Sequence, residues 1–452
     1  MIRRVSTAGW IALGVTLVVL AAGPPAAAQA RRCVVRSYKL NDFKPQLDGQ
    51  WQGIRVASDG NVYFASSTHS AHHGAAFFKY DPRTQKVTML CKDITTVCGE
   101  DPEKTPQPKI HSDVIEHKGW LYFCTHHSGG SPGSNERYPG SHVVGYEMAT
   151  GTFRDLGIVQ PNFTCYSGIG VDPVRSQLYV YVTPVTDGGI QKHGGALFFR
   201  LDIASGRKEK LGVLARAKWN HCFYLFVDRR GDCWFTNSHS NSTLFCARAE
   251  TGKLERYEDA LPPLYSPRRE ERVPEGRGTK DRWWSWAQPL PDGERCVFTQ
   301  FRGGMLWTFD ARNDVRSGKA FKPVKWLGDT GGLAAAYASN RYYWVRNNSS
   351  RRRSVRPELL SVAVETQGEP VIINHGAIED PEGRNPWRLP GMDADGEGKV
   401  YMVGDWRLKE GERGTHRYGY DRRTGQDTWR WLNRGEFFAV ADVGADLAAA
   451  GK

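Results

Sequence analysis

Short segments that alternate apolar and polar residues recur along nearly the whole chain, and this repeat constrains the fold more than any other feature. One unit reads GIRVASDGNVYFASSTHS and then AAFFKYDPRTQKVTML, a pattern that predicts four strands joined by turns. The DG and DP elements supply the Asp, Gly and Pro that tight hairpin turns require.

Seven such units follow one another at a spacing of roughly 40 to 55 residues, which is typical of propeller blades. The seventh reads GMDADGEGKVYMVGDWR and then HRYGYDRRTGQDTWRW. No long helical pattern interrupts the series. We therefore predict an all-β fold, a seven-bladed β-propeller with four antiparallel strands per blade.

The N-terminus has the pattern of a secretory signal peptide. Arg3 and Arg4 precede an apolar run from Trp10 to Ala22, and Ala28-Gln29-Ala30 supplies small residues for cleavage. The apolar run is too short for a membrane span. We expect residues 1–30 to be the signal peptide, residues 31–440 a single propeller domain, residues 441–452 a C-terminal tail, and the mature protein to be secreted or periplasmic.

The chain is basic, which is consistent either with solubility alone or with an acidic partner. The net charge of the full chain is +12, and loss of the signal peptide removes two Arg and no acidic residue, leaving +10. Nucleic acid, an anionic membrane surface and an acidic glycan are the partner classes that such a charge suggests. Export argues against nucleic acid, so we expect an acidic polysaccharide or oligosaccharide.

All nine cysteines lie in the mature part, where export permits disulfides. Cys91 and Cys98 flank a short loop and are the best local candidates for a pair. Cys124, Cys233 and Cys296 lie in apolar strand patterns and are expected in the core. There is no CxxC pair, so spacing does not indicate a structural zinc site.

Blade geometry predicts where a binding site lies. The start of each first strand, the end of each second strand and the loop that follows it lie on one face of the disc, so their residues converge around one mouth. The first strands start with Trp51, Gln52, His111, Tyr166, His221, Trp284, Trp286 and Trp387. The second strands end with or lead into His69, His72, His73, His126, His127, His239, Arg302 and Asp405.

Eight of the 13 histidines therefore share one face, and their clustering indicates a functional site. No nucleophile–His–acid order, P-loop or HExxH motif is present, and no pair of acids suggests a two-carboxylate glycosidase. Histidines, a tyrosine, an arginine and tryptophans instead suit removal of the C5 proton of a uronic acid whose carboxylate is neutralised. Tryptophans would stack on the sugar rings.

The motifs HHGAAFFKYDP, KIHSDVIEHKGWLYFCTHH and YSGIGVDPVRSQLYVY resemble the propeller polysaccharide lyases that cleave ulvan, and the related rhamnose–glucuronate lyases. The resemblance covers the first four blades and the rest only as architecture. It implies a lyase acting by β-elimination, with His111 and His127 as catalytic histidines, His126 as the neighbouring candidate, and Tyr166 as the catalytic tyrosine. His239 in TNSHS resembles a further histidine of the site.

The arginine of those lyases has no counterpart here. The third blade reads YVTPVTDGG where it would lie, and Arg302 or Lys192 are the candidates to replace it. Residues expected to bind substrate are His72, His73, His126, His221, Trp284, Trp286, Arg302 and Trp387. Trp284 and Trp286 could instead be core aromatics between blades.

Two other functions stay open on the sequence. A non-catalytic propeller that binds a glycan or a protein would keep the basic, aromatic mouth without needing its histidines. A metal-dependent hydrolase or lactonase would need carboxylate or Asn ligands, for which Asn237 and Asp405 are the candidates. The sequence requires no cofactor, although the histidine cluster could hold a divalent metal.

Overall fold

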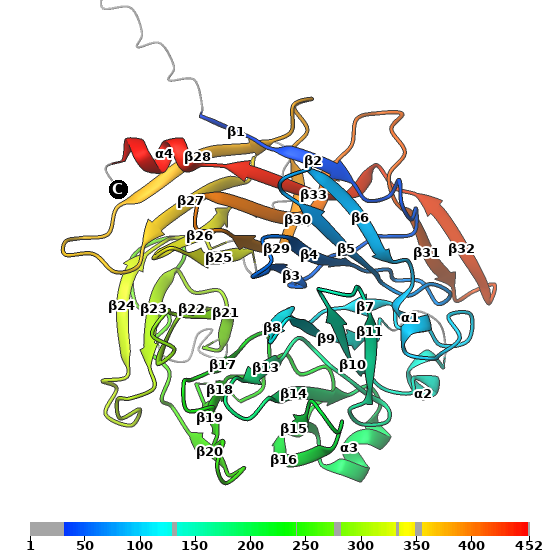
Figure 1. Cartoon of the computed structure of the whole chain (residues 1–452), viewed down its shortest axis with the longest axis horizontal. Helices are drawn as coiled ribbons and strands as arrows, with labels where there is room; N and C mark the ends of the chain where they lie inside the picture. Colours follow the sequence, from blue (N-terminus) through cyan, green and yellow to red (C-terminus); the bar gives the residue numbers. More distant parts are fainter. Residues whose placement is uncertain are drawn as a thin grey trace, which may run out of the picture.

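The computed structural model describes residues 31–128, 133–240, 242–274, 282–330, 334–348 and 355–450. These residues form seven antiparallel sheets arranged as a ring, which confirms the predicted seven-bladed β-propeller with four strands per blade (Figure 1). The expected signal peptide, residues 1–30, lies outside the described residues. In the described part of the chain, no helix combines the length and apolar character needed to cross a membrane.

Each blade begins at the centre of the ring and ends at its rim. Blade one is β3 (Ile54–Val56), β4 (Val62–Ser66), β5 (Ala76–Asp81) and β6 (Lys86–Cys91). Blade two is β8 (Ile115–His117), β9 (Trp120–His126), β10 (His142–Glu147) and β11 (Phe153–Ile158), with β7 (Lys109–Ile110) also on β9. Blade three is β13 (Ile169–Asp172), β14 (Gln177–Pro184), β15 (Ala196–Asp202) and β16 (Lys208–Ala215), with β12 (Phe163–Thr164) also on β14.

The next blades follow the same order. Blade four is β17 (Leu225–Val227), β18 (Cys233–Phe235), β19 (Leu244–Ala247) and β20 (Leu254–Tyr257). Blade five is β21 (Trp284–Pro289), β22 (Arg295–Gln300), β23 (Met305–Asp310) and β24 (Phe321–Trp326). Blade six is β25 (Ala335–Ala338), β26 (Arg341–Arg346), β27 (Glu358–Ala363) and β28 (Ile372–Glu379), with β1 (Arg32–Val34) added in parallel.

Blade seven is where the structure departs from the predicted strands. It consists of β29 (Pro386–Ala394), β30 (Lys399–Arg407), β33 (Arg434–Asp442) and the N-terminal β2 (Arg36–Lys39). The segment HRYGYDRRTGQDTWRW, predicted as its outer two strands, instead forms a separate hairpin of β31 (His416–Asp421) and β32 (Gln426–Trp431). The alternation of the hairpin matches that of a blade, so periodicity could not distinguish the two.

Both ends of the chain therefore close the ring. Strand β2 pairs antiparallel with β33, so the N-terminal segment is the outer strand of the last blade. Beyond residue 440, where a tail was expected, β33 continues to Asp442 and α4 (Gly444–Ala449) buries Leu447 in the core. The remaining helices are α1 (Ile94–Val97), α2 (Ser134–Arg137) and α3 (Asp187–His193), all in loops between strands.

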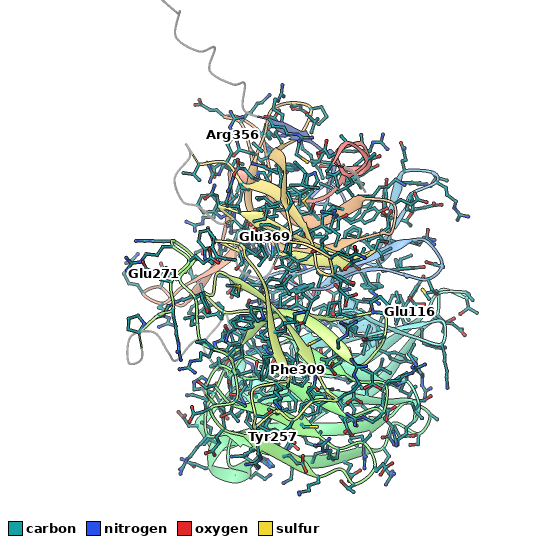
Figure 2. The ribbon with its side chains drawn as sticks, turned by 90° about the vertical axis from the view of Figure 1, so that its left-hand side faces the viewer. Glu116, Tyr257, Glu271, Phe309, Arg356 and Glu369 are labelled. Atoms are coloured by element: carbon teal, nitrogen blue, oxygen red, sulfur yellow. The ribbon has the colours of Figure 1, made fainter. Side chains whose placement is uncertain are left out.

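The blades are held together by apolar side chains that face one another across adjacent sheets. Phe64 of blade one stacks on Phe438 of blade seven, with ring centroids 4.5 Å apart. Phe309 of blade five is fully buried and lies within the dense side-chain layer of Figure 2, whereas Glu271 lies on a loop that projects from it. The predicted hairpin turns also form, because carboxylates such as Asp81 accept the backbone N–H two residues further on.

Candidate active site

Two inner strands are interrupted, and each interruption contains one of the predicted site residues. Strands β7 and β8 both pair with β9, and His111 lies in the gap between them. Strands β12 and β13 both pair with β14, and Tyr166 lies in the corresponding gap of the next blade. An irregular backbone at the rim of a sheet redirects side chains. The two breaks therefore give His111 and Tyr166 equivalent places in adjacent blades.

Gly168 allows the backbone after Tyr166 to lie close to Tyr181 and Cys222, because a glycine has no Cβ. A Cβ on Gly168 would lie 2.8 Å from the Cβ of Tyr181 and 3.0 Å from the carbonyl oxygen of Cys222. Ser167, beside it, has a φ of +86° and bridges to Cys222 of blade four. The break in blade three is thereby fixed against its neighbour, and Tyr166 with it.

His111, His126 and Tyr166 form a triangle of aromatic rings. Their centroids are 5.0 Å apart for the two histidines, 4.8 Å for His111 and Tyr166, and 4.7 Å for His126 and Tyr166. His221 stacks on the outer face of Tyr166 at 4.1 Å, and burial lowers the pKa of His221 to about 4. Four residues from three blades thus meet at one point, as blade geometry predicted.

The hydrogen bonds of His126 define its tautomer. Its Nδ1 lies 2.7 Å from the hydroxyl of Thr164 and 3.0 Å from the carbonyl oxygen of Cys165. The carbonyl can only accept, so it favours the tautomer with the proton on Nδ1 and the lone pair on Nε2. Burial lowers the pKa of His126 well below 6.5, and the charges of His111 and Lys109 lower it further. His126 is therefore a neutral imidazole whose Nε2 can accept a proton.

His111 is held in a similar way. Its Nδ1 lies 2.7 Å from the hydroxyl of Ser167, and that hydroxyl donates to Gln52 at 3.4 Å, so it accepts from the histidine. Burial, followed by the charge of Lys109, lowers the pKa of His111 well below its usual value. Both histidines of the triangle are therefore neutral at pH 7.

Tyr166 complements them as a proton donor. Burial raises its pKa, so the phenol keeps its proton at pH 7. No described residue forms a hydrogen bond with its hydroxyl, although the side chain is only partly buried. The group is therefore available to a ligand in the mouth.

A cationic wall of Lys109 and Arg388 on Trp51 adjoins the triangle, and the sequence patterns did not predict it. Trp51 stacks on His111 at 4.2 Å, while the Lys109 Nζ and the Arg388 guanidinium lie 5.3 and 4.9 Å from the Trp51 ring centroid. Burial lowers the pKa of Lys109 to about 8, against the opposing charge of Asp48. KIHS contains Lys109 two residues before His111, on the same side of an extended segment, and this spacing could have identified it.

Buried carboxylates hold the cations in place. Arg388 lies 3.4 Å and Arg434 3.8 Å from Asp405, whose strand neighbour is Glu436. Burial and the adjacent Asp405 raise the pKa of Glu436 far above its usual range, so the pair retains a proton. The acid pair could not be predicted from the sequence, because Glu436 lies in β33, outside the strands predicted for the last blade.

His127 and His239, predicted as catalytic, lie beside the triangle rather than in it. The ring of His127 stacks on Tyr138 at 4.4 Å, and its Nε2 bonds to Asn135 at 2.9 Å. His239 is exposed and bonds to Asn220 at 3.1 Å. The structure therefore places His126, the neighbouring candidate, and not His127 against the rings of His111 and Tyr166.

His72 and His73 face the hairpin β31–β32. His72 pairs with Asp427 at 2.6 Å, and the ring of His73 lies 5.8 Å from that of Trp429. A hollow of about 580 Å³ runs from His72 to His127. His72 therefore lines a hollow that reaches His127 beside the mouth, whereas His73 does not line it.

The prediction that Trp284 and Trp286 bind substrate is wrong. They are 0% and 2% exposed and pack on Phe298 and Tyr342 in the core, so they cannot stack on a substrate. The register of β21 shifts between them, so that Trp284 lies opposite Gln300 and Trp286 opposite Thr299, and both indoles are buried. The neighbouring Trp283 instead lies 6.1 Å from His221, between the core and the mouth.

Neither replacement for the missing arginine lies in the triangle. Arg302 is exposed and lies over Phe301, which stacks on Trp283. Lys192 is exposed in the last turn of α3. Arg388, which follows Trp387 directly in the sequence, is the arginine that reaches the site.

Trp387 belongs to a basic groove between blade seven and the hairpin β31–β32. The guanidinium of Arg407 lies 5.3 Å from its ring centroid, and Trp431 on the opposite side is 49% exposed. The other basic residues that line the groove are Arg384, Lys409, Arg417, Arg430 and Arg434. Arg417 also pairs with Asp48 at 3.4 Å, so the groove leads to the cationic wall.

The cysteines and candidate metal ligands also differ from the expectations. All nine cysteines are free thiols, Cys91 and Cys98 included, and Cys124, Cys233 and Cys296 are buried as expected. Among the described residues, His, Cys and acidic ligand atoms gather for a metal at Cys98, His142 and Asp155. Burial would lower the pKa of His142, but hydrogen bonds to Asp155, Cys98 and Glu100 raise it to about 11.

Comparison with known proteins finds likeness of fold alone. No model of a protein family matches the chain, and no curated protein matches it. Among solved structures it is similar to an oligogalacturonate lyase in complex with manganese, with a TM-score of 0.49 and 10% identity over 90% of this chain and 96% of the other. It is also similar to the β-propeller domain of Cps50 (Swd1) from Myceliophteria thermophila, with a TM-score of 0.49 and 12% identity over 87% and 96%. For TolB from Acinetobacter baumannii the TM-score is 0.40, with 9% identity over 75% and 70%. Propellers host many functions, so function is argued below from the side chains.

Proposed function

We propose that the protein is an exported polysaccharide lyase that cleaves a uronic-acid-containing glycan by β-elimination. The observation that carries the proposal is the triangle of His111, His126 and Tyr166 beside the Lys109 and Arg388 cations. It combines a neutral base, a protonated phenol and a fixed positive charge in one mouth. These are the three groups that elimination next to a carboxylate requires.

In the first step, the cations bind the carboxylate of the sugar. Lys109 and Arg388 neutralise this carboxylate, which stabilises the negative charge that develops when the C5 proton leaves. Trp51, between these cations and His111, provides an aromatic surface for the sugar ring. The buried Asp405 holds Arg388 from behind, so the guanidinium is positioned before the substrate arrives.

Proton transfer completes the reaction. Nε2 of His126 accepts the C5 proton, the C4–O bond breaks, and the Tyr166 phenol donates its proton to the leaving oxygen. The electron pair of the C5–H bond becomes the C4=C5 double bond, and no water is consumed. His126 is favoured over His111 as the base because it lies directly opposite Lys109 on β7 and β9, and because a backbone carbonyl accepts the proton of its Nδ1.

The basic groove supports a polyanionic substrate. Arg407, Arg417 and Arg430 line it, and its exposed Trp431 offers a stacking surface for further sugar units. Because Arg417 contacts Asp48 beside Lys109, a chain lying in the groove reaches the reacting centre. We propose an acidic polysaccharide or oligosaccharide as the partner and the periplasm or exterior as its location.

The test is ultraviolet absorbance of the unsaturated product, with purified mature protein and a panel of uronic acid glycans that includes ulvan and rhamnose–glucuronate chains. Product that forms with wild type and disappears in His126→Ala supports the proposal. Glycan binding without product in wild type, retained in His111→Ala and His126→Ala, would replace it with a non-catalytic binding propeller.

A further inference from the structure

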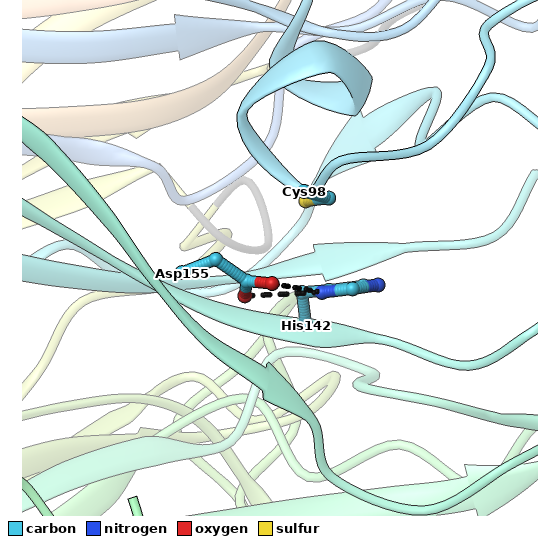
Figure 3. A group of neighbouring side chains, drawn as sticks. All are labelled: Cys98, His142 and Asp155. Carbon is cyan, nitrogen blue, oxygen red and sulfur yellow. Dashed lines mark hydrogen bonds and ion pairs between the residues drawn. The ribbon is translucent and has the colours of Figure 1, made fainter.

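A cluster of metal-ligating side chains lies outside the triangle, where the loop after blade one meets blade two. Cys98 follows α1, His142 starts β10 and Asp155 lies in β11 (Figure 3). One ligand atom from each lies within 4.8 Å of the others. Cys98 and His142 are 8% and 4% exposed, whereas the Asp155 side chain is 25% exposed, so the cluster is buried on two sides and open to solvent at Asp155.

The hydrogen bonds around His142 resemble those of a metal-bound histidine. Its Nδ1 lies 3.0 Å from both carboxylate oxygens of Asp155, while its Nε2 lies 2.9 Å from Glu100. A ligating histidine commonly binds metal through one nitrogen and donates to a carboxylate from the other. Here Asp155 lies on the ligand side and Glu100 on the outer side.

We propose that Cys98, His142 and Asp155 bind a divalent cation of the Zn²⁺ type, which fastens the insertion between β6 and β7 to blade two. Thiolate, imidazole and carboxylate together are ligands that zinc accepts. Binding displaces the thiol proton of Cys98 and the Nδ1 proton of His142 to solvent. The sequence could not show this site by spacing because its ligands come from three separate segments.

A continuous set of hydrogen bonds connects this site to the mouth. Glu100 accepts from the amide of Gln107 at 2.8 Å, and Gln107 accepts from the hydroxyl of Tyr138 at 2.8 Å. The ring of Tyr138 in turn stacks on His127. Through these hydrogen bonds, the metal would help to hold His127 in place beside the triangle. This role rests on the function proposed above.

The first experiment measures zinc in the whole mature protein. Wild type is loaded with Zn²⁺, freed of excess by gel filtration, and assayed by inductively coupled plasma mass spectrometry. We expect one zinc per chain, loss of binding in Cys98→Ser and in Asp155→Asn, and full binding in Cys91→Ser. Cys91 is a matched control because it is a nearby thiol outside the cluster.

Wild type can be tested alone, which guards against variants that do not fold. Added Zn²⁺ should raise its thermal midpoint and slow hydrogen exchange in residues 94–107 and 134–141. Wild type that binds no zinc, a Cys91–Cys98 disulfide, or full binding in both ligand variants would each overturn the site. These measurements need no substrate, so failure of the metal site and failure of the lyase proposal are distinguishable.

One variant tests whether the hydrogen bonds connect the metal site to the mouth. Tyr138→Phe removes the hydroxyl that bonds to Gln107 but keeps the ring that stacks on His127. We expect it to bind zinc as wild type does, while zinc no longer slows exchange in residues 134–141. Zinc-dependent protection that survives in Tyr138→Phe would show that the hydrogen bonds do not transmit the effect.

Discussion

Lys109 and His126 lie directly opposite each other on β7 and β9. Opposed residues of an antiparallel pair project their side chains to the same face of the sheet. The sheet therefore sets the Lys109 cation beside the proposed base without help from a flexible loop. The same register explains why the charge of Lys109 lowers the pKa of His126, because the two groups are held close in a buried place.

The first prediction separates the two adjacent histidines. His126→Ala should lower kcat by roughly 10²–10⁴-fold, the usual contribution of a general base. His127→Ala should lower it far less, because its ring stacks on Tyr138 outside the triangle. Initial rates of absorbance increase on the same glycan measure both.

Circular dichroism of both variants provides the control for folding. If His127→Ala is the inactive variant while His126→Ala is active, the assignment from the resemblance holds and the one from geometry is wrong. Equal loss in both would indicate that the whole CTHH segment must be intact for the mouth to form.

The second prediction concerns pH. Lys109 has a pKa lowered to about 8 by burial, so it is charged below that pH and neutral above it. Activity should therefore fall as pH rises through about 8, because the neutral amine no longer stabilises the carboxylate charge. The pKa of His126 is lowered well below 6.5, so its base form persists on the acidic side. The pH profile of kcat/KM measures both limits.

Lys109→Arg is the informative variant for this profile. A guanidinium stays protonated across the range, so the alkaline limb should move to higher pH even if the rate is lower. An alkaline limb that stays near pH 8 in Lys109→Arg would assign it to another group.

The blades and their turns could be predicted from the sequence because each strand carries its own alternation and each turn its own Asp or Gly. Ring closure could not, because β2 joins β33 across nearly the whole chain length and nothing in either segment specifies the other. The hairpin β31–β32 was mistaken for the outer half of blade seven for the same reason. Local patterns specify strands, whereas partners are chosen by packing.

The site was predictable to the extent that blade geometry governs it. His111, Tyr166 and His221 lie at first-strand positions and do converge. The difference between His126 and His127 is not in the pattern, since adjacent residues of a strand point to opposite sides and only the observed register shows which one faces the mouth. The predicted substrate contacts of Trp284 and Trp286 were wrong for the same reason, because only the observed register shows which side of β21 each indole faces.

The third prediction identifies the arginine of the site. Arg388→Ala should lower kcat/KM by about 10²-fold or more, because it removes a preorganised charge aimed at the substrate and leaves Asp405 without that partner. Arg302→Ala should stay near wild type, since Arg302 is exposed and lies over Phe301. Steady-state kinetics on one glycan compare the two, and a large loss confined to Arg302→Ala would move the carboxylate site to blade five.

The last prediction tests ring closure. Phe438 of β33 is 0% exposed and stacks on Phe64 of blade one, while Tyr38 lies opposite it on β2 with the ring centroids 6.1 Å apart. Phe438→Ala should lower the free energy of unfolding by about 3–5 kcal/mol, the cost of truncating a buried phenylalanine. Trp431→Ala, a truncation of an exposed aromatic on the hairpin, should change it by no more than about 0.5 kcal/mol. Chemical denaturation measures both. Comparable destabilisation by the two variants would mean that the hairpin, rather than the contact between first and last blades, closes the ring.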